Sequence, residues 1–303
     1  MTGTGTQNDP YIISDWNDFI TAVGTSNAYV EFPKNLVHTS DTNVDPNKLY
    51  TDANGVIQTN VQPTDLANLY ENTFVLDAND YAPDGLSSPI SIVCASLNGY
   101  GGTIKNLASS SASIIETYSF VSFTGIAFLN VRCTNAYFFV SDRNNGWGTV
   151  SKCIFTGRMG GESTCRFIWA SLVHFVSCAF NVQLYGSSNF AENNEGRYDW
   201  LVFNYCRINT EDHRTGSTYA HTYTISNSIW TGNYNYYISA TMNPYDYTVY
   251  DLECASIQGN NSAVTKYIFV NSEKCANTNG VAVTTAELQS ASALAAKGFP
   301  IQV

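Results

Sequence analysis

Charged residues are scarce in this chain. Only 13% of its 303 residues are Asp, Glu, Lys or Arg, about half the share of an ordinary globular domain. The 14 basic residues are outnumbered by 25 acidic ones, and no run of Lys or Arg occurs. Because contacts to phosphates need clustered cations, nucleic-acid binding has little support, and an anionic membrane surface is an equally poor partner.

Long apolar runs and metal motifs are also missing. No stretch of 18 apolar residues occurs, so the sequence predicts no membrane insertion. The start, Met1 to Gly5, lacks the basic and apolar segments of a secretory signal. If Met1 is the native start, we expect synthesis in a cytosol; the alternative is a chain whose signal was removed. No CxxC or HExxH motif is present, so neither a metal site nor a cofactor is expected.

Neutral polar residues and apolar residues are abundant instead. Apolar residues make up 44% of the chain, which permits a sizeable core in one large domain or two ordinary ones. Ser, Thr, Asn, Gly and Tyr take the place of charge. A neutral polar surface suits a stacked β structure, because like charges on successive rungs would repel one another.

A repeat runs through the middle of the chain. The pattern is an apolar residue, any two residues, a small or apolar residue, any one residue and a second apolar residue. Its central position recurs after steps of 27, 25, 28, 22 and 24 residues. Steps of this length close a coil of three short strands and three turns. The sequence therefore predicts an all-β, right-handed parallel β-helix. One internal column should hold the central side chains, which are Ile126, Cys153, Cys178, Cys206, Ser228 and Leu252.

The eight cysteines bear on this prediction. Cys153, Cys178 and Cys206 share one register, so we expect them to point inward as reduced thiols that pack as small apolar groups. A disulfide or a reactive thiol is the alternative, because an even number of cysteines in a secreted protein is typical of disulfides.

Both ends of the chain have the pattern of caps. Ser14 or Asp15 can N-cap a short helix ended by Gly24, whose apolar face should plug the first coil and comprises Trp16, Phe19, Ile20 and Val23. Thr284 and Glu287 form a capping box for a helix predicted from Ala286 to Lys297. We predict an N-terminal cap over 1–28, a β-helix over 29–275 with an irregular excursion at 36–72, and a C-terminal capping helix and tail over 276–303.

Three segments resemble known proteins. The opening Gly3-Thr4-Gly5-Thr6 … Asp9-Pro10-Tyr11-Ile12-Ile13, the segment Leu97-Asn98-Gly99-Tyr100-Gly101-Gly102-Thr103-Ile104 and rungs such as Phe175-Val176-Ser177-Cys178-Ala179-Phe180 are similar to the pectin-lyase-like β-helix superfamily. The resemblance covers most of residues 3–270. It implies the fold; the superfamily includes pectate lyases, polygalacturonases and phage tailspikes, and the short, capped chain most resembles the phage members.

One acidic cluster is the best catalytic candidate. Glu211, Asp212 and His213 are consecutive, and a pair of carboxylates can act as acid and base in glycoside cleavage while the histidine tunes them. The alternative is a solvated turn with local ion pairs. The aspartate clusters of lyases and hydrolases of this superfamily have no clear counterpart here.

Aromatic residues in predicted turns suggest glycan contacts. A tyrosine next to Asn or Asp can stack on a sugar ring while its neighbour bonds the hydroxyls. The candidates are Trp147, Tyr234, Tyr236, Tyr245, Arg158 and Glu162. These tyrosines also fit a subunit interface or simple strand packing.

The sequence therefore predicts a structural protein of a tailed-phage virion, a fibre, spike or capsid-surface component that contacts host surface glycans. We expect the protein to assemble in the bacterial cytoplasm as a homotrimer that contacts other virion proteins. A polysaccharide lyase or glycoside hydrolase on the same scaffold is the alternative, and a bacterial surface adhesin is the third.

Overall fold

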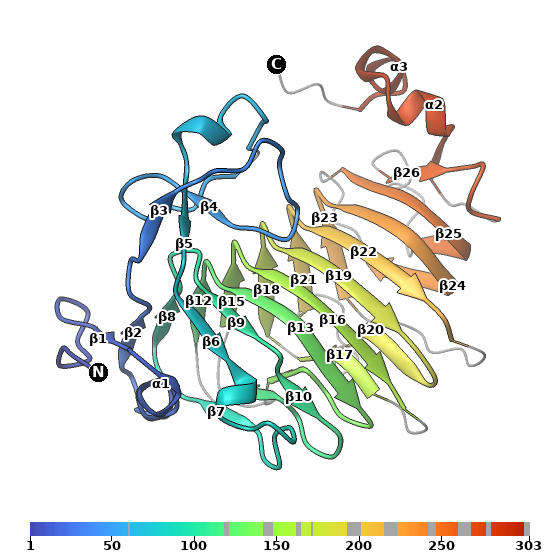
Figure 1. The fold of residues 1–303 in the computed structure, drawn as a ribbon. Helices are drawn as coiled ribbons and strands as arrows, with labels where there is room; N and C mark the ends of the chain where they lie inside the picture. Colours follow the sequence, from blue (N-terminus) through green and yellow to red (C-terminus); the bar gives the residue numbers. More distant parts are fainter. Residues whose placement is uncertain are drawn as a thin grey trace.

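The chain is a β-solenoid of stacked parallel strands (Figure 1), so the predicted all-β parallel fold is confirmed. The computed structural model describes all residues except 60, 118–120, 142–147, 162–164, 171, 193–200, 215–222, 242–246, 260–267, 277–279 and 300–303. Within strands, the side chains of 223, 235–241, 255, 256, 258 and 259 also lie outside the description. In the part that the structure describes, no helix is long and apolar enough to cross a membrane.

A regular coil has three sides. The first side consists of β2 (Tyr29–Glu31), β8 (Ser96–Asn98), β12 (Ser122–Thr124), β15 (Gly148–Ser151), β18 (Val173–Val176), β21 (Leu201–Asn204) and β23 (Tyr223–Ser226). The second consists of β6 (Val75–Asp77), β9 (Thr103–Lys105), β13 (Ala127–Thr134), β16 (Ile154–Gly160), β19 (Ala179–Leu184), β22 (Arg207–Asp212), β24 (Ile229–Thr241), β25 (Thr248–Gly259) and β26 (Ile268–Asn271). The third is a separate sheet of β7 (Ile90–Ile92), β11 (Ile115–Thr117), β14 (Phe139–Ser141), β17 (Cys165–Trp169) and β20 (Ser188–Glu192).

The corner between the first and second sides is a sharp bend. One residue there has a positive φ in successive coils, as in Lys152 (51°), Ser177 (54°) and Tyr205 (55°). Its backbone N–H donates to the next coil; that of Lys152, for example, donates to the Val176 carbonyl at 2.9 Å. The left-handed conformation turns the chain within two residues, which keeps the corner tight and the coils in register.

The predicted internal column follows this corner residue. Ile126, Cys153, Cys178, Cys206 and Ser228 are all buried, and the residues after them pair in register. The prediction for Leu252 is wrong, because Val249 pairs with Ile229 and the column therefore continues at Thr248. Leu252 is also buried but lies beside Gly232, four residues further along the strand. Thr248 also fits the repeat pattern, with Tyr245 three positions before it and Tyr250 two positions after it, so the pattern alone does not distinguish Thr248 from Leu252.

Small donors occupy the column for a reason that the structure makes plain. In three successive coils the column side chain donates to the carbonyl three residues before the column position of the preceding coil: Cys178 to Val150, Cys206 to Phe175, and Ser228 to Phe203. Cys153 instead donates to the Ser151 carbonyl of its own coil. Thr248 continues the pattern by donating to Ile225. The thiols and hydroxyls therefore pair carbonyls at the bend, where an apolar side chain would leave that contact unmade. Burial raises the pKa of Cys178 well above its usual value, so its thiol stays protonated.

Aromatic side chains fill the rest of the core in stacks along the solenoid axis. The rings of Phe128 and Phe155 are parallel with centroids 5.2 Å apart, and Phe180 continues the stack at 4.9 Å. Phe175 and Phe203 form a second stack at 5.2 Å. Such spacing repeats the separation of neighbouring strands, so each coil sets the position of the next ring.

The N-terminal helix caps the first coil. Asp15 accepts a hydrogen bond from the backbone N–H of Asp18 at the start of α1 (Trp16–Val23), and Gly24 ends it. Trp16, Phe19 and Val23 are buried as predicted, whereas Ile20 is only partly so. β1 (Tyr11–Ile12) extends the capped end by pairing with β2.

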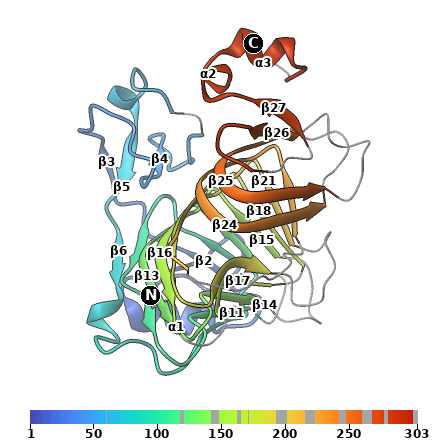
Figure 2. The ribbon, with the colours of Figure 1, turned by 90° about the vertical axis from the view of Figure 1, so that its right-hand side faces the viewer.

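The other end is closed by two helices instead of the single one predicted. Thr284 and Glu287 form the expected capping box on α2 (Thr285–Leu288). The chain then breaks at Gln289, and Ser290 caps α3 (Ala291–Ala296). Ser290, a favourable N-cap residue in the middle of the predicted helix, is the sequence signal for a second helix. Both helices lie beyond β26 and β27 (Val281–Val283), at the end of the solenoid opposite α1 (Figure 2).

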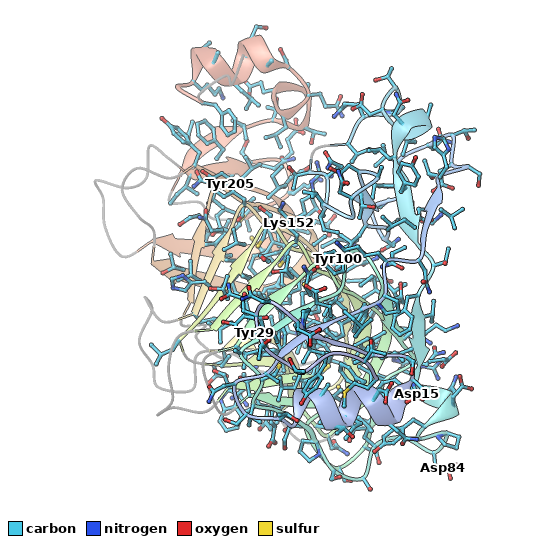
Figure 3. All side chains as sticks on the ribbon, turned by 90° about the vertical axis from the view of Figure 1, so that its left-hand side faces the viewer. Asp15, Tyr29, Asp84, Tyr100, Lys152 and Tyr205 are labelled. Atoms are coloured by element: carbon cyan, nitrogen blue, oxygen red, sulfur yellow. The ribbon has the colours of Figure 1, made fainter. Side chains whose placement is uncertain are left out.

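The predicted excursion at 36–72 contains a small antiparallel sheet of β3 (Leu36–His38), β4 (Tyr50–Thr51) and β5 (Tyr70–Asn72). Tyr50, Leu66 and Leu69 form its own buried cluster. The excursion leaves and rejoins the first coil at the sharp corner, and Lys152 donates to the Ile57 carbonyl beneath it at 3.3 Å. Tyr100, Lys152 and Tyr205 are seen along this corner in Figure 3, so the excursion covers its first part and leaves Tyr205 exposed.

Candidate functional site

The outer face of the second side carries polar side chains at matching positions in successive coils. Strand residues alternate between the core and solvent, and one outward position repeats an amide or hydroxyl in successive coils. Those residues are Asn106, Asn130, Thr156, Asn181, Asn209 and Thr231. Asn130 donates to Asn106 at 2.6 Å and Asn209 donates to Asn181 at 3.0 Å. The result is a lane of amides along the solenoid axis.

A second outward lane beside the first is charged. Arg132 lies next to Arg158, which lies next to Gln183, which lies next to Glu211. Neighbouring parallel strands are about 4.8 Å apart, so two guanidinium groups leave the sheet side by side. Neither arginine has a carboxylate partner among the residues that the structure describes, although the chain as a whole carries a net charge of −11.

A bulge places the two arginines next to each other. The pairing of β13 with β16 shifts between Phe128 and Val131, where Asn130 adopts a positive φ of 55°. Opposite the bulge is Gly157, at which a Cβ atom would lie 2.5 Å from the Val131 carbonyl oxygen. Only glycine permits so close an approach of the strands. Without the extra residue, Arg132 and Arg158 would not share a register.

The arginines and the amide lane surround an open depression of about 460 Å³. Its lining consists of Asn130, Arg132, Thr156, Gly157, Arg158, Asn181 and Gln183. This volume falls within the range of small-ligand sites. The lining residues supply hydrogen-bond donors from arginine, amide and hydroxyl groups, and none of them carries a carboxylate.

Arg158 is held in place by a stack of side chains from three coils. Its guanidinium carbon lies 4.1 Å from the ring centroid of Tyr185, and that ring stacks on His213 at 4.6 Å. His213 Nε2 is 2.8 Å from a carboxylate oxygen of Glu211, whose other oxygen accepts from Gln183 at 2.8 Å. The hydrogen bonds from Gln183 and then His213 lower the pKa of Glu211. Both Glu211 and His213 are exposed on this face.

The predicted catalytic pair of Glu211 and Asp212 is not a pair. The two residues are adjacent on β22, so their side chains point to opposite faces, and Asp212 is 4% exposed while Glu211 faces solvent. Asp212 accepts two hydrogen bonds from the Arg214 side chain, which is itself buried and donates to Asn189 and to the Ser188 carbonyl. Asp212 is therefore bound within the core and cannot reach a substrate beside Glu211.

The predicted glycan-binding residues divide into three groups. Arg158 lies on the face just described. Tyr234 is a correction: it is fully buried, packs on Trp230 with centroids 5.2 Å apart and lies under the Arg214 guanidinium, so it presents no ring to a sugar. Trp147, Tyr245 and Glu162 lie outside the described residues, as does the side chain of Tyr236.

Sequence reasoning missed Arg132 and Tyr185. Arg132 is 26 positions before Arg158, one coil length, so the repeat itself could have aligned them. The signal was hidden by the bulge at Asn130, which adds one residue to that coil. Tyr185 lies directly after β19 and before Gly186, outside the repeated pattern, so the repeat gives no signal for it.

Among the described residues, no group of three or more His, Cys, Asp or Glu is placed to hold a metal ion. Comparisons with protein-family models, with curated proteins and with solved structures found no match. The function must therefore be argued from the geometry of this face.

Proposed function

We propose that the chain is a rigid structural component of a virion that binds an acidic polysaccharide of the host surface through the face of β13, β16, β19 and β22. The observation that carries the binding is the pair Arg132 and Arg158, two adjacent guanidinium groups in an amide-lined depression, with no carboxylate partner among the residues that the structure describes. Two such groups repel each other unless an anion neutralises them.

A uronic acid or another acidic sugar supplies that anion. A carboxylate accepts two parallel hydrogen bonds from one guanidinium, and Arg158 is already oriented by the Tyr185 ring, which reduces the conformational entropy lost on binding. The neutral amides Asn130 and Asn181 can bond sugar hydroxyls on the same face. The lanes repeat with the coil, so an extended polymer can lie along the axis.

Binding of defined oligosaccharides tests this proposal. Isothermal titration with acidic and neutral hexasaccharides should give binding of an acidic one only. Arg158→Met should raise its Kd about tenfold or more, because a hydrogen bond to a charged group contributes about 1.5–3 kcal/mol. Lys34→Met is the control, since Lys34 is exposed over Tyr100 at the corner, away from this face, and its loss changes the net charge equally. Equal effects of the two substitutions would reduce the site to a general charge effect and refute it.

The assignment to a phage virion rests on the solenoid, on its surface of low charge and on the resemblance of the opening and rung motifs to β-helix virion proteins. A stacked array of parallel coils resists bending and suits a fibre or spike. The proposed assembly is a homotrimer that contacts other virion proteins. Light scattering tests the trimer, and mass spectrometry of purified particles tests the location; a monomer absent from every particle fraction would contradict both.

A polysaccharide lyase is the second candidate, and the exposed pair of Glu211 and His213 favours it. In such a reaction Arg158 would neutralise the sugar carboxylate while His213, oriented by Glu211 at 2.8 Å, accepts the proton next to it. Ultraviolet absorbance of the unsaturated product separates the two functions. Steady product formation that His213→Ala abolishes would establish cleavage, whereas binding without product supports recognition alone.

A further inference from the structure

Cys254 and Cys275 are neighbours at the C-terminal end of the solenoid. Cys254 lies on β25, and Cys275, 21 positions further along the chain, forms a parallel bridge with it. The two sulfur atoms are 2.9 Å apart, and the residues are 8% and 5% exposed. The N–H of Ala276 also donates to the Cys254 carbonyl at 3.2 Å, so the backbone holds the two positions side by side.

The column cysteines differ from this pair. Cys178 and Cys206 donate their thiols to backbone carbonyls of the bend, and Cys178 also interacts with the thiols of Cys153 and Cys206. The sulfur atoms of Cys254 and Cys275, by contrast, are in direct contact at 2.9 Å. Residues paired across parallel strands have Cα atoms about 4.8 Å apart, which lies inside the range that a disulfide spans. Little backbone movement is needed to join them.

We propose that Cys254 and Cys275 are a modification site that forms a disulfide when the chain meets an oxidising environment. The oxidant is a small disulfide such as oxidised glutathione. One thiolate attacks it, forms a mixed disulfide and releases one thiol; the second cysteine then displaces the other thiol and completes the bond. Two protein thiols are oxidised, one external disulfide is reduced to two thiols, and no further reactant is required.

The bond fastens the C-terminal cap to the solenoid. Residues after Cys275 lead to β27, α2 and α3, which are joined to the core chiefly through β26 and β27. Burial raises the pKa of the Cys254 thiol and limits the oxidant's access. Oxidation in the folded chain should therefore be slow and should follow local opening of this segment. This inference stands whether or not the face of β13 to β22 binds a glycan.

Peptide mapping tests the inference on the whole chain. After incubation in a glutathione buffer rich in the oxidised form, the protein is denatured, alkylated and digested with trypsin. Cleavage at Arg214, Lys266, Lys274 and Lys297 places the two cysteines in separate peptides, 215–266 and 275–297. We expect these peptides to be linked and the other six cysteines to be alkylated. Alkylation of both Cys254 and Cys275 after prolonged oxidation would overturn the proposal, as would linkage of either one to a different cysteine.

A protection assay gives a second readout. Proteolysis between residues 276 and 303 should slow about tenfold or more in the oxidised protein, because the bond constrains the open state, and reducing agent should reverse this. Cys178→Ser is the matched control and should keep the linkage and the protection. Cys254→Ser should remove both. Equal cleavage rates of oxidised and reduced wild-type protein would show that the bond does not fasten the cap.

Discussion

Replacing Arg214 by Met should be among the most destabilising single changes in this chain. The side chain of Arg214 is 2% exposed and that of Asp212 is 0% exposed. Arg214 donates to the Asp212 carboxylate, to Asn189 and to the Ser188 carbonyl, and its guanidinium lies 4.7 Å from the Tyr234 ring centroid. The substitution fills a similar volume but leaves the charge of Asp212 buried.

The magnitude follows from that uncompensated charge. Removing one partner of a buried ion pair costs about 3–5 kcal/mol, whereas exposed pairs contribute about 0–1 kcal/mol. Lys274 and Asp251 are such a pair, with side chains 34% and 29% exposed. Arg214→Met should therefore lower the free energy of unfolding by several kcal/mol, and Lys274→Met by less than about 1 kcal/mol.

Urea unfolding followed by circular dichroism measures both variants. A double variant, Asp212→Leu with Arg214→Met, should recover much of the lost stability, because it removes both charges together. An Arg214→Met variant no more destabilised than Lys274→Met would contradict a buried, ionised pair of Asp212 and Arg214.

Three further perturbations test the corner, the bulge and the cap. Cys206→Ser should leave the urea midpoint nearly unchanged, because Ser228 fills the same column position in the next coil. Cys206→Leu should lower the free energy of unfolding by about 1–3 kcal/mol by overpacking. Equal midpoints of the two variants would contradict the requirement for a small residue in the column. Gly157→Ala should lose about 1–3 kcal/mol and weaken glycan binding, because its Cβ meets a carbonyl at 2.5 Å; unchanged calorimetric binding would count against the bulge. Hydrogen bonds from the Thr284 N–H and then from Lys297 lower the pKa of Glu287 in the folded protein. Ionised Glu287 therefore stabilises the fold at pH values above its unfolded pKa, near 4.5, and this stabilisation is lost as the pH falls through the lower folded pKa. The difference in thermal midpoint between wild type and Glu287→Gln should therefore be seen near pH 6 and vanish near pH 3, and a constant difference would contradict the assignment.

The repeat predicted the solenoid because its physical basis is local. The step of two dozen residues reflects the length of a coil, and the small residue at Cys153, Cys178 and Cys206 reflects a bend that recurs unchanged. The same logic failed at Leu252, where an apolar residue four positions late imitated the pattern. Periodicity is reliable where the corner constrains residue type and weak where any buried residue will do.

The candidate site was harder to predict, because it depends on neighbours from different coils. Glu211 and Asp212 are adjacent in sequence yet face opposite sides of a strand, while Arg132 and Arg158 are 26 positions apart yet lie side by side. Only the register across the bulge at Asn130 brings the arginines together. Tyr234 shows the same difficulty, since its turn-like sequence context gave no sign of the buried Arg214 that covers it.

A crystal structure with a bound acidic hexasaccharide would show whether the face of β13, β16, β19 and β22 is the binding site. We expect a sugar carboxylate within hydrogen-bond distance of Arg158, with Arg132 on the neighbouring strand and the chain of sugars along the amide lane. A ligand bound on another face would contradict the proposed site. A crystal structure in which Arg132 and Arg158 are not neighbours would equally contradict it.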